Sequence, residues 1–435
     1  MRSRLRPRPV KRLFLNVSSK DFTEVEEKDR EIVDGVHASR SVRLPACHQC
    51  DFPLPPGLGP FQLSTAELFL LQYFEAFITP SCLLPGFNNI YCEVMIPMCL
   101  SSLTQPLLHS VLAVSANQLR LLGHQSYAYS TWAYYSKALS GVQHSLQETQ
   151  EASGLAQLEL ILACSIMLCF FDVSAACSKS WVEHARCARA VLVRLMTFRS
   201  AYPKRSRLCQ LAASYFASHD VLARTGCNNL KQAPWDFDAV CDREESAIDP
   251  LFGCSPMLLN LVAETTKLAE RQEKGTSYDQ LIDSSDLQRF TLERRLHSLG
   301  LEKQNHERSL IAESKRLAAL LYFYGRLDRK APNNTQIVRL TREMLGIIEE
   351  LSTCTTILLW PLFIVAVYGI RPEEEEGRAL ILDRLSSMQQ SRQLMHVKRT
   401  RTMIESVWKV RDLFPETTSS SWELLCTQKQ TISLT

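Results

Sequence analysis

The chain has 435 residues, of which 46% are hydrophobic and 22% charged, a composition typical of a folded protein with a sizeable core. Its 49 basic and 46 acidic residues leave a net charge of +3, which excludes a strong overall attraction to nucleic acid. The chain is long for one ordinary domain, although single helical domains of roughly 300 residues exist.

The first 60 residues have the composition of a linker rather than of a core. Six of the first twelve residues, MRSRLRPRPVKR, are Arg or Lys. No long apolar segment follows them, and Pro7 and Pro9 oppose an amphipathic helix, so we expect neither a secretory signal nor a mitochondrial presequence. The proline-rich stretch 50–60 completes this part, and we predict that residues 1–60 are mostly disordered. Their basic tip is interpreted as an unstructured tail or a nuclear-import patch.

From residue 61 the sequence predicts helices and almost no strands. Ser64-Thr65-Ala66-Glu67 forms a capping-box pattern at the start of the first helix. Segment 105–123 has an apolar stripe (Leu108, Val111, Leu112, Ser115, Leu119 and Leu122) and ends at Gly123, and the next helix repeats the pattern with Tyr134, Ala138 and Val142. Further helices are predicted at 154–171, 179–198, 206–224, 255–271, 286–300, 308–328, 334–351, 354–369, 376–390 and 394–412.

These elements predict an all-α fold of about a dozen or more packed helices over residues 61–426, followed by a C-terminal tail, 427–435.

Two apolar segments have to be compared with a membrane span. Segment 155–171 contains Gln157 and Glu159, and segment 357–370 is short and contains Pro361. A span needs about 20 apolar residues, so we interpret both segments as core helices of a soluble protein.

The chain contains fifteen cysteines, which are scattered rather than paired. Most lie inside apolar, helically periodic segments, where we expect small buried thiols in the reduced state. This pattern indicates an intracellular, reducing compartment. The cysteines that carry this prediction are Cys99, Cys164, Cys169, Cys187 and Cys209.

The stretch KSWVEHARCARAVLVRL, residues 179–195, predicts an amphipathic helix that is anchored to the core by a tryptophan. Glu183 and Arg186 lie on its polar side, with Arg189 near the boundary. These arginines either form a solvated face or dock an acidic partner. The predicted core face consists of Trp181, His184, Ala185, Ala188, Val191, Leu192 and Leu195.

Two groups of residues have the chemistry of metal ligands. Cys47 and Cys50 have the spacing of one half of a zinc site, but no second cysteine pair follows in the linker. The stretch WDFDAVCDREE could hold magnesium in a helical enzyme of the terpene-cyclase type, which would need a second carboxylate cluster opposite it. No second cluster occurs, and we interpret the stretch as a solvated loop. Its carboxylates are Asp236, Asp238, Asp242, Glu244 and Glu245.

No nucleophile pattern accompanies these residues. The sequence contains no Gly-x-Ser-x-Gly elbow, no phosphate-binding glycine loop and no dinucleotide fingerprint. His219 and Asp220 are adjacent, but neighbouring side chains on a helix diverge by about 100° and do not face one substrate. We therefore predict no catalytic, cofactor-binding or metal-ligating residues in the helical part, and a protein that is not an enzyme.

Several stretches, in order, resemble the fungal-specific transcription factor domain, the helical region that follows a binuclear zinc cluster in that family. Trp181, His184 and Ala188 match a pattern similar to the family's Trp-x-x-His-x-x-x-Ala. The resemblance covers residues 61–426 with colinear spacing. Its other stretches are LLQYFEAFITPSC, MIPMCLSSLTQPLLHSVLAVSANQL, SKALSGVQHSL, FASHDVLART, DPLFGCSPMLLNLVAETTKLAER, LLWPLFIVAV and IESVWKVRD with SWELL.

The resemblance implies a nuclear transcription regulator whose helical domain senses a small apolar metabolite or contacts other regulators. It suggests control of a metabolic or secondary-metabolite gene set, with homodimers or heterodimers as the acting form and no role for a membrane. The alternative function, from another class, is a helical enzyme of secondary metabolism that uses the segment from Asp236 to Glu245.

The sequence departs from the family in one respect. The family's DNA reader binds two zinc ions through six cysteines within about thirty residues, whereas only Cys47 and Cys50 precede the helical part here. We therefore expect contact with promoter DNA only through a zinc cluster missing from this sequence or through a partner. A truncated gene model, loss of the reader and action through a partner all remain open.

Overall fold

The computed structural model describes eleven stretches of the chain, all within one compact unit, Leu63–Thr435. Within these stretches the chain is helical, without a β-strand, and Asp249 and Cys254 form an isolated antiparallel bridge. The all-α prediction is confirmed. The described residues are 63–100, 105–148, 154–176, 180–197, 206–226, 247–273, 282–300, 305–352, 355–414, 420–427 and 432–435.

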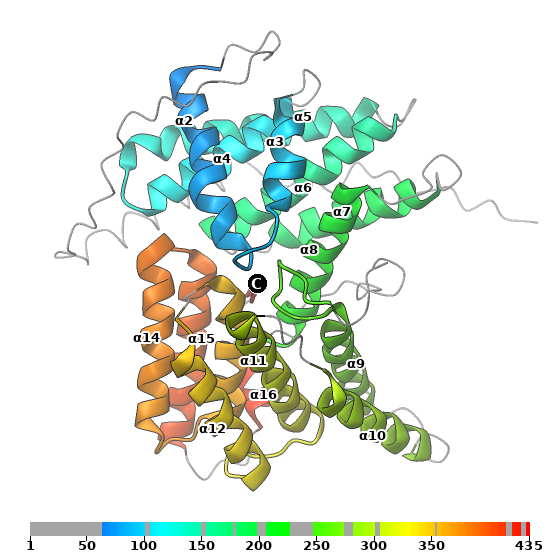
Figure 1. The fold of residues 1–435 in the computed structure, drawn as a ribbon, viewed down its shortest axis with the longest axis vertical. Coiled ribbons are helices and arrows are strands. Elements are labelled where there is room, and N and C mark those ends of the chain that lie inside the picture. The colour runs from blue at the N-terminus through cyan, green and yellow to red at the C-terminus, as the bar shows by residue number, and fades with distance from the viewer. Residues whose placement is uncertain are drawn as a thin grey trace, which may run out of the picture. The chain divides into compact units, whose positions relative to one another are not determined.

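The helices agree closely with the predicted segments, with their ends shifted by a few residues (Figure 1). The α-helices are α2 (Thr65–Tyr73), α3 (Ile96–Cys99), α4 (Gln105–Leu121), α5 (Ala128–Glu148), α6 (Leu155–Ala175), α7 (Ser180–Thr197), α8 (Arg207–Arg224), α9 (Pro256–Glu273), α10 (Ile282–Ser298), α11 (His306–Tyr322), α12 (Thr335–Glu350), α13 (Leu359–Ile364), α14 (Glu375–Arg392), α15 (Met395–Leu413) and α16 (Ser421–Thr427).

Helix ends follow the capping chemistry of the sequence. The Glu67 backbone N–H donates to the Ser64 hydroxyl at 3.3 Å, and the Ser64 backbone N–H donates to the Glu67 carboxylate at 3.0 Å, which completes the predicted capping box. Just beyond α4, Gly123 has a φ of +97°, a left-handed conformation that glycine adopts without steric cost. Both ends were predictable because each depends on residues at most four positions apart.

The burial of α4 and α5 differs from the predicted single stripes. Helix α4 packs against both α5 and α6, so nearly every side chain from Leu107 to Leu119 is buried (Figure 1). On α5, Ala138 and Val142 are buried as predicted, but Tyr135 rather than Tyr134 completes the core face. Both tyrosines are within one turn of Ala138, so helical spacing alone does not distinguish them.

Helix α6 corresponds to the first apolar segment compared with a membrane span. By length and composition alone it could cross a membrane, yet 83% of its most apolar window is buried inside the protein. It packs against α4, α5, α7, α8 and α15, as expected of a core helix.

The second apolar segment, Thr356–Gly369, consists of a 3₁₀ turn, α13 and a π-helical turn, and it is almost entirely buried. Pro361 lies in the first turn of α13, where a missing backbone N–H costs little.

A buried carboxylate on α6 connects three helices. Asp172, 6% exposed, accepts a 2.9 Å hydrogen bond from the Tyr135 hydroxyl of α5. The His184 Nε2 atom of α7 lies 3.1 Å from the second Asp172 carboxylate oxygen. Two residues further along α6, the Ser174 hydroxyl accepts a hydrogen bond from the Asn117 amide of α4 at 3.2 Å. Polar contacts between neighbouring helices therefore fix the register of α4 to α7.

Helix α7 buries the predicted face. Trp181 is 1% exposed, and its ring lies 6.2 Å, centroid to centroid, from the ring of His219 on α8. On the polar side Arg186 is exposed and pairs with Glu183 of the same helix. This pairing agrees with the solvated-face interpretation. The residues of the predicted face, Trp181, His184, Ala185, Ala188, Val191, Leu192 and Leu195, are all buried.

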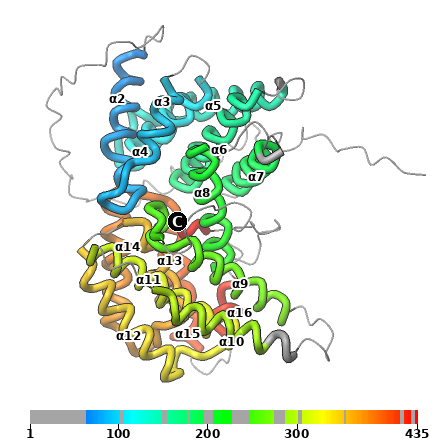
Figure 2. The backbone as a smooth tube through the Cα atoms, turned by 45° about the vertical axis from the view of Figure 1, so that its right-hand side comes forward, coloured from blue at the N-terminus to red at the C-terminus, as the bar shows by residue number. Residues whose placement is uncertain are grey.

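The C-terminal helices form further packed pairs. Helix α11 packs on α12, and α14 packs on α15 (Figure 2). Helix α16 is held by Trp422, whose ring lies 3.9 Å from the Arg326 guanidinium. Beyond α16, in the segment predicted to be a tail, Ile432, Ser433 and Leu434 are buried, so the described end of the chain contributes to the core.

We expect the substitution Trp181→Ala to lower the free energy of unfolding by about 3–5 kcal/mol, because it removes a fully buried aromatic ring between α7 and α8. Urea unfolding followed by circular dichroism measures this loss. Val193→Ala, on the same helix but 57% exposed, is the control and should change stability by less than about 0.5 kcal/mol. Equal effects of the two substitutions would contradict the anchoring role of Trp181.

Candidate ligand-binding cavity

A cavity of about 70 Å³ lies between elements from both halves of the chain. It is bounded by α6, α8, the turn before α9, the 3₁₀ turn Thr356–Leu358 and the connection between α14 and α15. One part of its wall is apolar, and most of the lining residues are buried. The apolar side chains are Phe170, Val173, Leu251, Phe252, Ile357 and Leu394.

A guanidinium group forms the charged part of the wall. Arg392, the last residue of α14, donates from Nε to the Gln118 side-chain oxygen at 3.0 Å and from Nη1 to the Ser81 hydroxyl at 2.8 Å. The Gln118 amide in turn donates to the Arg392 carbonyl at 2.7 Å. The Nη2 atom of Arg392 is buried and has no hydrogen-bond partner among the described residues. The guanidinium also lies 5.7 Å from the centroid of the Phe170 ring, and Thr435, the last residue of the chain, lines the same cavity.

Two buried histidines also line the cavity. Burial lowers the pKa of His219 from 6.5 to about 4, opposed by the Tyr215 carbonyl oxygen, which lies 2.8 Å from its Nδ1 atom. Burial, together with the positive charges of Arg392 and His219, lowers the pKa of His396 to about 3, and the backbone of Val173 opposes this shift. Both rings are therefore neutral at pH 7. Among the described residues, neither ring nitrogen of His396 has a hydrogen bond of standard geometry.

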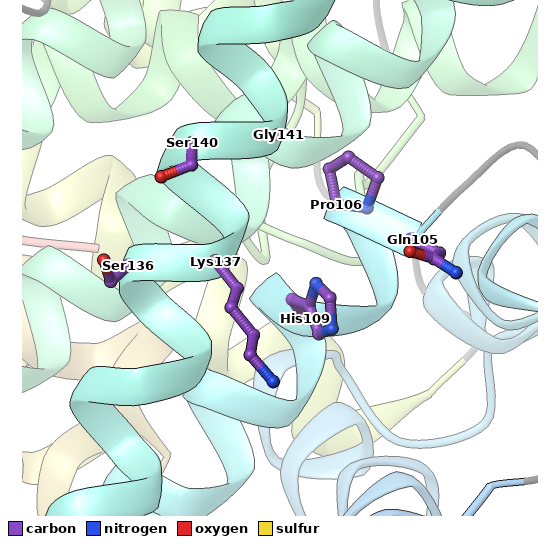
Figure 3. Close-up of a pocket in the computed structure, with 7 residues that line it drawn as sticks. All are labelled: Gln105, Pro106, His109, Ser136, Lys137, Ser140 and Gly141. Carbon is purple, nitrogen blue, oxygen red and sulfur yellow. The ribbon is translucent and has the colours of Figure 1, made fainter.

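A second hollow lies on the surface between α4 and α5. It has a volume of about 310 Å³, and its lining side chains are exposed or half-buried. Figure 3 shows Lys137 of α5 and His109 of α4 extending into the space between the two helices. A site that binds a small molecule usually buries most of the ligand surface. The surface hollow cannot do so, and the cavity whose lining is mostly buried is the better candidate.

His219 and Asp220 point to different partners, as helical geometry predicts. The Nδ1 atom of His219 contacts the Tyr215 carbonyl one turn earlier. Asp220 accepts two hydrogen bonds from the Arg224 guanidinium at 2.9 and 3.0 Å, which forms a buried ion pair along α8. The pair does not form a catalytic dyad. However, His219 lines the cavity, a position that the sequence analysis did not assign to it.

The metal-ligand candidates lie outside the described residues. Cys47 and Cys50 precede residue 63, and the carboxylates from Asp236 to Glu245 fall between residues 226 and 247. Within the described ranges no cluster of three or more His, Cys, Asp or Glu side chains could hold a metal ion. The cysteines predicted to be buried thiols, Cys99, Cys164, Cys169, Cys187 and Cys209, are buried and free of disulfides.

Sequence reasoning missed the two residues that give the cavity its polarity, Arg392 and His396. Both lie in the polar stretch SRQLMHVKR, which has no distinctive apolar periodicity. The available signal was the start of the predicted helix 394–412. The N-cap position is Leu394, whose side chain cannot accept a hydrogen bond from the helix backbone. Most helices have Ser, Thr, Asp or Asn at this position.

The two buried histidines predict acid sensitivity. Their folded-state pKa values lie below the ordinary value of 6.5, so the unfolded chain binds more protons as the pH falls below 6.5. Stability should therefore be lost between pH 6.5 and about 4, by on the order of 1 kcal/mol per pH unit for each histidine. Urea unfolding at pH 7.0, 6.0 and 5.0 measures the slope.

His396→Leu should flatten this pH dependence, because a leucine takes up no proton in the unfolded state. His306→Leu is the control, since the His306 side chain is 78% exposed. An unchanged slope in His396→Leu, or an equal flattening in both variants, would contradict the assignment of the buried, neutral imidazole.

Comparison with known proteins identifies one family. The family model described as the fungal specific transcription factor domain matches residues 69–435, which is most of the chain. No curated protein and no solved structure matches the chain. The match includes the Trp181 helix, the cavity and the C-terminal residues, and it confirms the resemblance seen in the sequence. The chain therefore belongs to the fungal specific transcription factor domain family.

Proposed function

We propose that this chain is a nuclear regulator of transcription whose helical domain responds to a small metabolite. Membership of the fungal specific transcription factor domain family supports the regulatory class and argues for a role other than catalysis. The observation that carries the metabolite response is the cavity with a mixed apolar and polar wall between α6, α8 and the connection between α14 and α15. Control of a metabolic or secondary-metabolite gene set is the expected output.

The composition of the cavity wall favours binding over a purely structural role. A core that serves only stability is close-packed and places its buried charges in ion pairs. Here a guanidinium, two histidines and apolar side chains border an open space of about 70 Å³. The cavity therefore has the properties of a site that is completed by another molecule.

The position of the cavity supports transmission of a signal. Its lining comes from elements that are far apart in the sequence, including α6, α8 and the connection between α14 and α15. A ligand that contacts all of them stabilises the arrangement in which they meet. Binding could in this way shift the domain between an active and an inactive state. Homodimers or heterodimers with other regulators are the proposed acting form.

Contact with promoter DNA is proposed to occur through a separate reader. The near-neutral net charge of the chain gives the helical domain little attraction for DNA phosphates. A binuclear zinc cluster outside these 435 residues, or one carried by a partner regulator, would supply that contact. The helical domain would then determine when the reader acts.

Deletion of the gene in its organism tests the proposed function. We expect altered levels of a defined set of transcripts, restored by the wild-type gene and by Val193→Ala, a substitution on the exposed side of α7. Ser218→Leu should fail to restore them under inducing growth conditions, because it fills the cavity and removes only a hydroxyl bonded to its own helix. RNA sequencing is the measurement. Unchanged transcripts after deletion would refute a regulatory role.

A further inference from the structure

The last four residues of the sequence, 432–435, lie inside the domain, and we call them the terminal segment. Ile432, Ser433 and Leu434 are at most 1% exposed, and Thr435 lines the cavity. The segment has no regular secondary structure. Figures 1 and 2 both place this end of the chain in the middle of the domain rather than at its periphery. The terminal segment is therefore an irregular stretch inserted next to the candidate binding site.

Apolar side chains hold the terminal segment in place. A Cβ atom added to Gly226, just beyond α8, would lie 2.8 Å from the Ile432 Cδ1 atom and 3.2 Å from the Cζ atom of Phe363 on α13. Ile432 thus occupies space that the glycine leaves open. Leu434, two positions further on, is just as deeply buried. The segment is packed against the end of α8 and against α13 by the burial of two aliphatic side chains.

Among the described residues, no hydrogen bond ties the terminal segment to the rest of the domain. Its one hydrogen bond joins the hydroxyls of Ser433 and Thr435, 3.1 Å apart. The turn before α9, which also lines the cavity, is fixed by backbone bonds such as that from the Leu84 N–H to the Pro250 carbonyl at 2.9 Å. Buried backbone groups without partners cost free energy. The inserted position of the terminal segment is therefore opposed by its own backbone.

A segment with these properties opens more easily than the helices around it. Local opening is least costly where few apolar contacts and few backbone hydrogen bonds are lost. Release of the terminal segment exposes Ile432 and Leu434 and breaks no helix. Opening of α6, by contrast, would expose a long and almost wholly buried apolar helix. The terminal segment is thus expected to leave its place while the helical core stays folded.

The size of the cavity gives such an opening a consequence. Cavities that hold small-molecule ligands usually measure about 300–1,000 Å³. With the terminal segment in place the cavity measures about 70 Å³, which is room for roughly five to seven groups of the size of a water molecule. Departure of the segment would add the volume of its side chains to this space. The inserted segment therefore limits which molecules can enter.

We propose that the terminal segment is an autoinhibitory plug, which closes the cavity, leaves it by local opening and competes with a small-molecule ligand for the space. A ligand that binds only the open state shifts the population toward that state. The free energy of opening then lowers the apparent affinity and sets the ligand concentration at which the domain responds. This inference deepens the proposed function and rests on it, because it names how access to the sensing cavity is regulated.

Thiol labelling of the full chain measures the opening. Ser433→Cys places a thiol on the terminal segment, and Ser218→Cys places one on α8 at the cavity wall, both at positions at most 2% exposed. The native thiol of Cys164 on α6, 0% exposed, reports on the core. Each variant is treated with iodoacetamide in buffer without denaturant, and peptide mass spectrometry gives the rate of modification at each site.

We expect the thiols introduced at positions 433 and 218 to react about tenfold or more faster than Cys164, because release of the segment exposes both while the core stays folded. Low concentrations of urea should accelerate Cys164 more steeply, since unfolding exposes more surface than local opening. A thiol at 433 that reacts no faster than Cys164 would overturn the proposal, because the segment would then open only with the whole fold. A fast thiol at 433 with a slow thiol at 218 would overturn it as well, because the segment would not close the cavity.

A substitution in the segment assigns the opening to it. In the Ser218→Cys background, Leu434→Asp should speed labelling at position 218 about tenfold or more and leave Cys164 unchanged, because a carboxylate favours water over a buried site. Leu413→Asp, at a position 62% exposed, is the matched control and should change neither rate. Equal acceleration at Cys164 would make Leu434 an ordinary core residue and refute the plug. If Leu434→Asp does not fold, the comparison of thiols in the chain with the native segment decides.

The outcome is separable from that of the proposed function. Fast labelling at positions 433 and 218 combined with unchanged transcripts in the deletion strain would refute the regulatory role and retain the plug. Altered transcripts combined with slow labelling at both positions would retain the regulator and refute the plug.

Discussion

The packing of the first half of the domain depends on how one buried carboxylate is accommodated. Asp172 lies near the end of α6, a helix that is otherwise almost wholly apolar and buried. An unpaired charge at this depth would cost several kcal/mol. Tyr135 and His184 contact its two oxygens from opposite neighbouring helices. These contacts favour the observed relative position of α5, α6 and α7 over others that apolar packing alone would permit.

The same contacts explain the Trp-x-x-His pattern in α7. His184 anchors the helix to α6 through Asp172, and Trp181, one turn earlier, packs its ring against His219 of α8. His219 then forms part of the cavity wall. The pattern links the most apolar helix of the core to the candidate binding site. A change in the position of α8 would alter both the contact with Trp181 and the shape of the cavity.

Several other buried polar groups of the domain have partners. The Trp360 indole N–H donates to the Thr225 hydroxyl at 3.0 Å, and the Trp408 indole N–H donates to the Ala366 carbonyl at 2.8 Å. These bonds join elements that are distant in the sequence, and they satisfy the two buried indole N–H groups. Around the cavity, Arg392 donates to Gln118 and Ser81 and borders an open space, and α15 begins without a side-chain cap.

The sequence by itself determined where most of the helices lie, which face of α7 is buried and which family the chain resembles. Those properties depend on residues within about four positions of each other, through the 3.6-residue period and capping chemistry. Only the tertiary structure decided that α4 is buried on nearly all sides, that Tyr135 faces the core, and that Arg392 and His396 meet His219. These residues are far apart in the sequence, and no local periodicity encodes which side chains come to line one cavity.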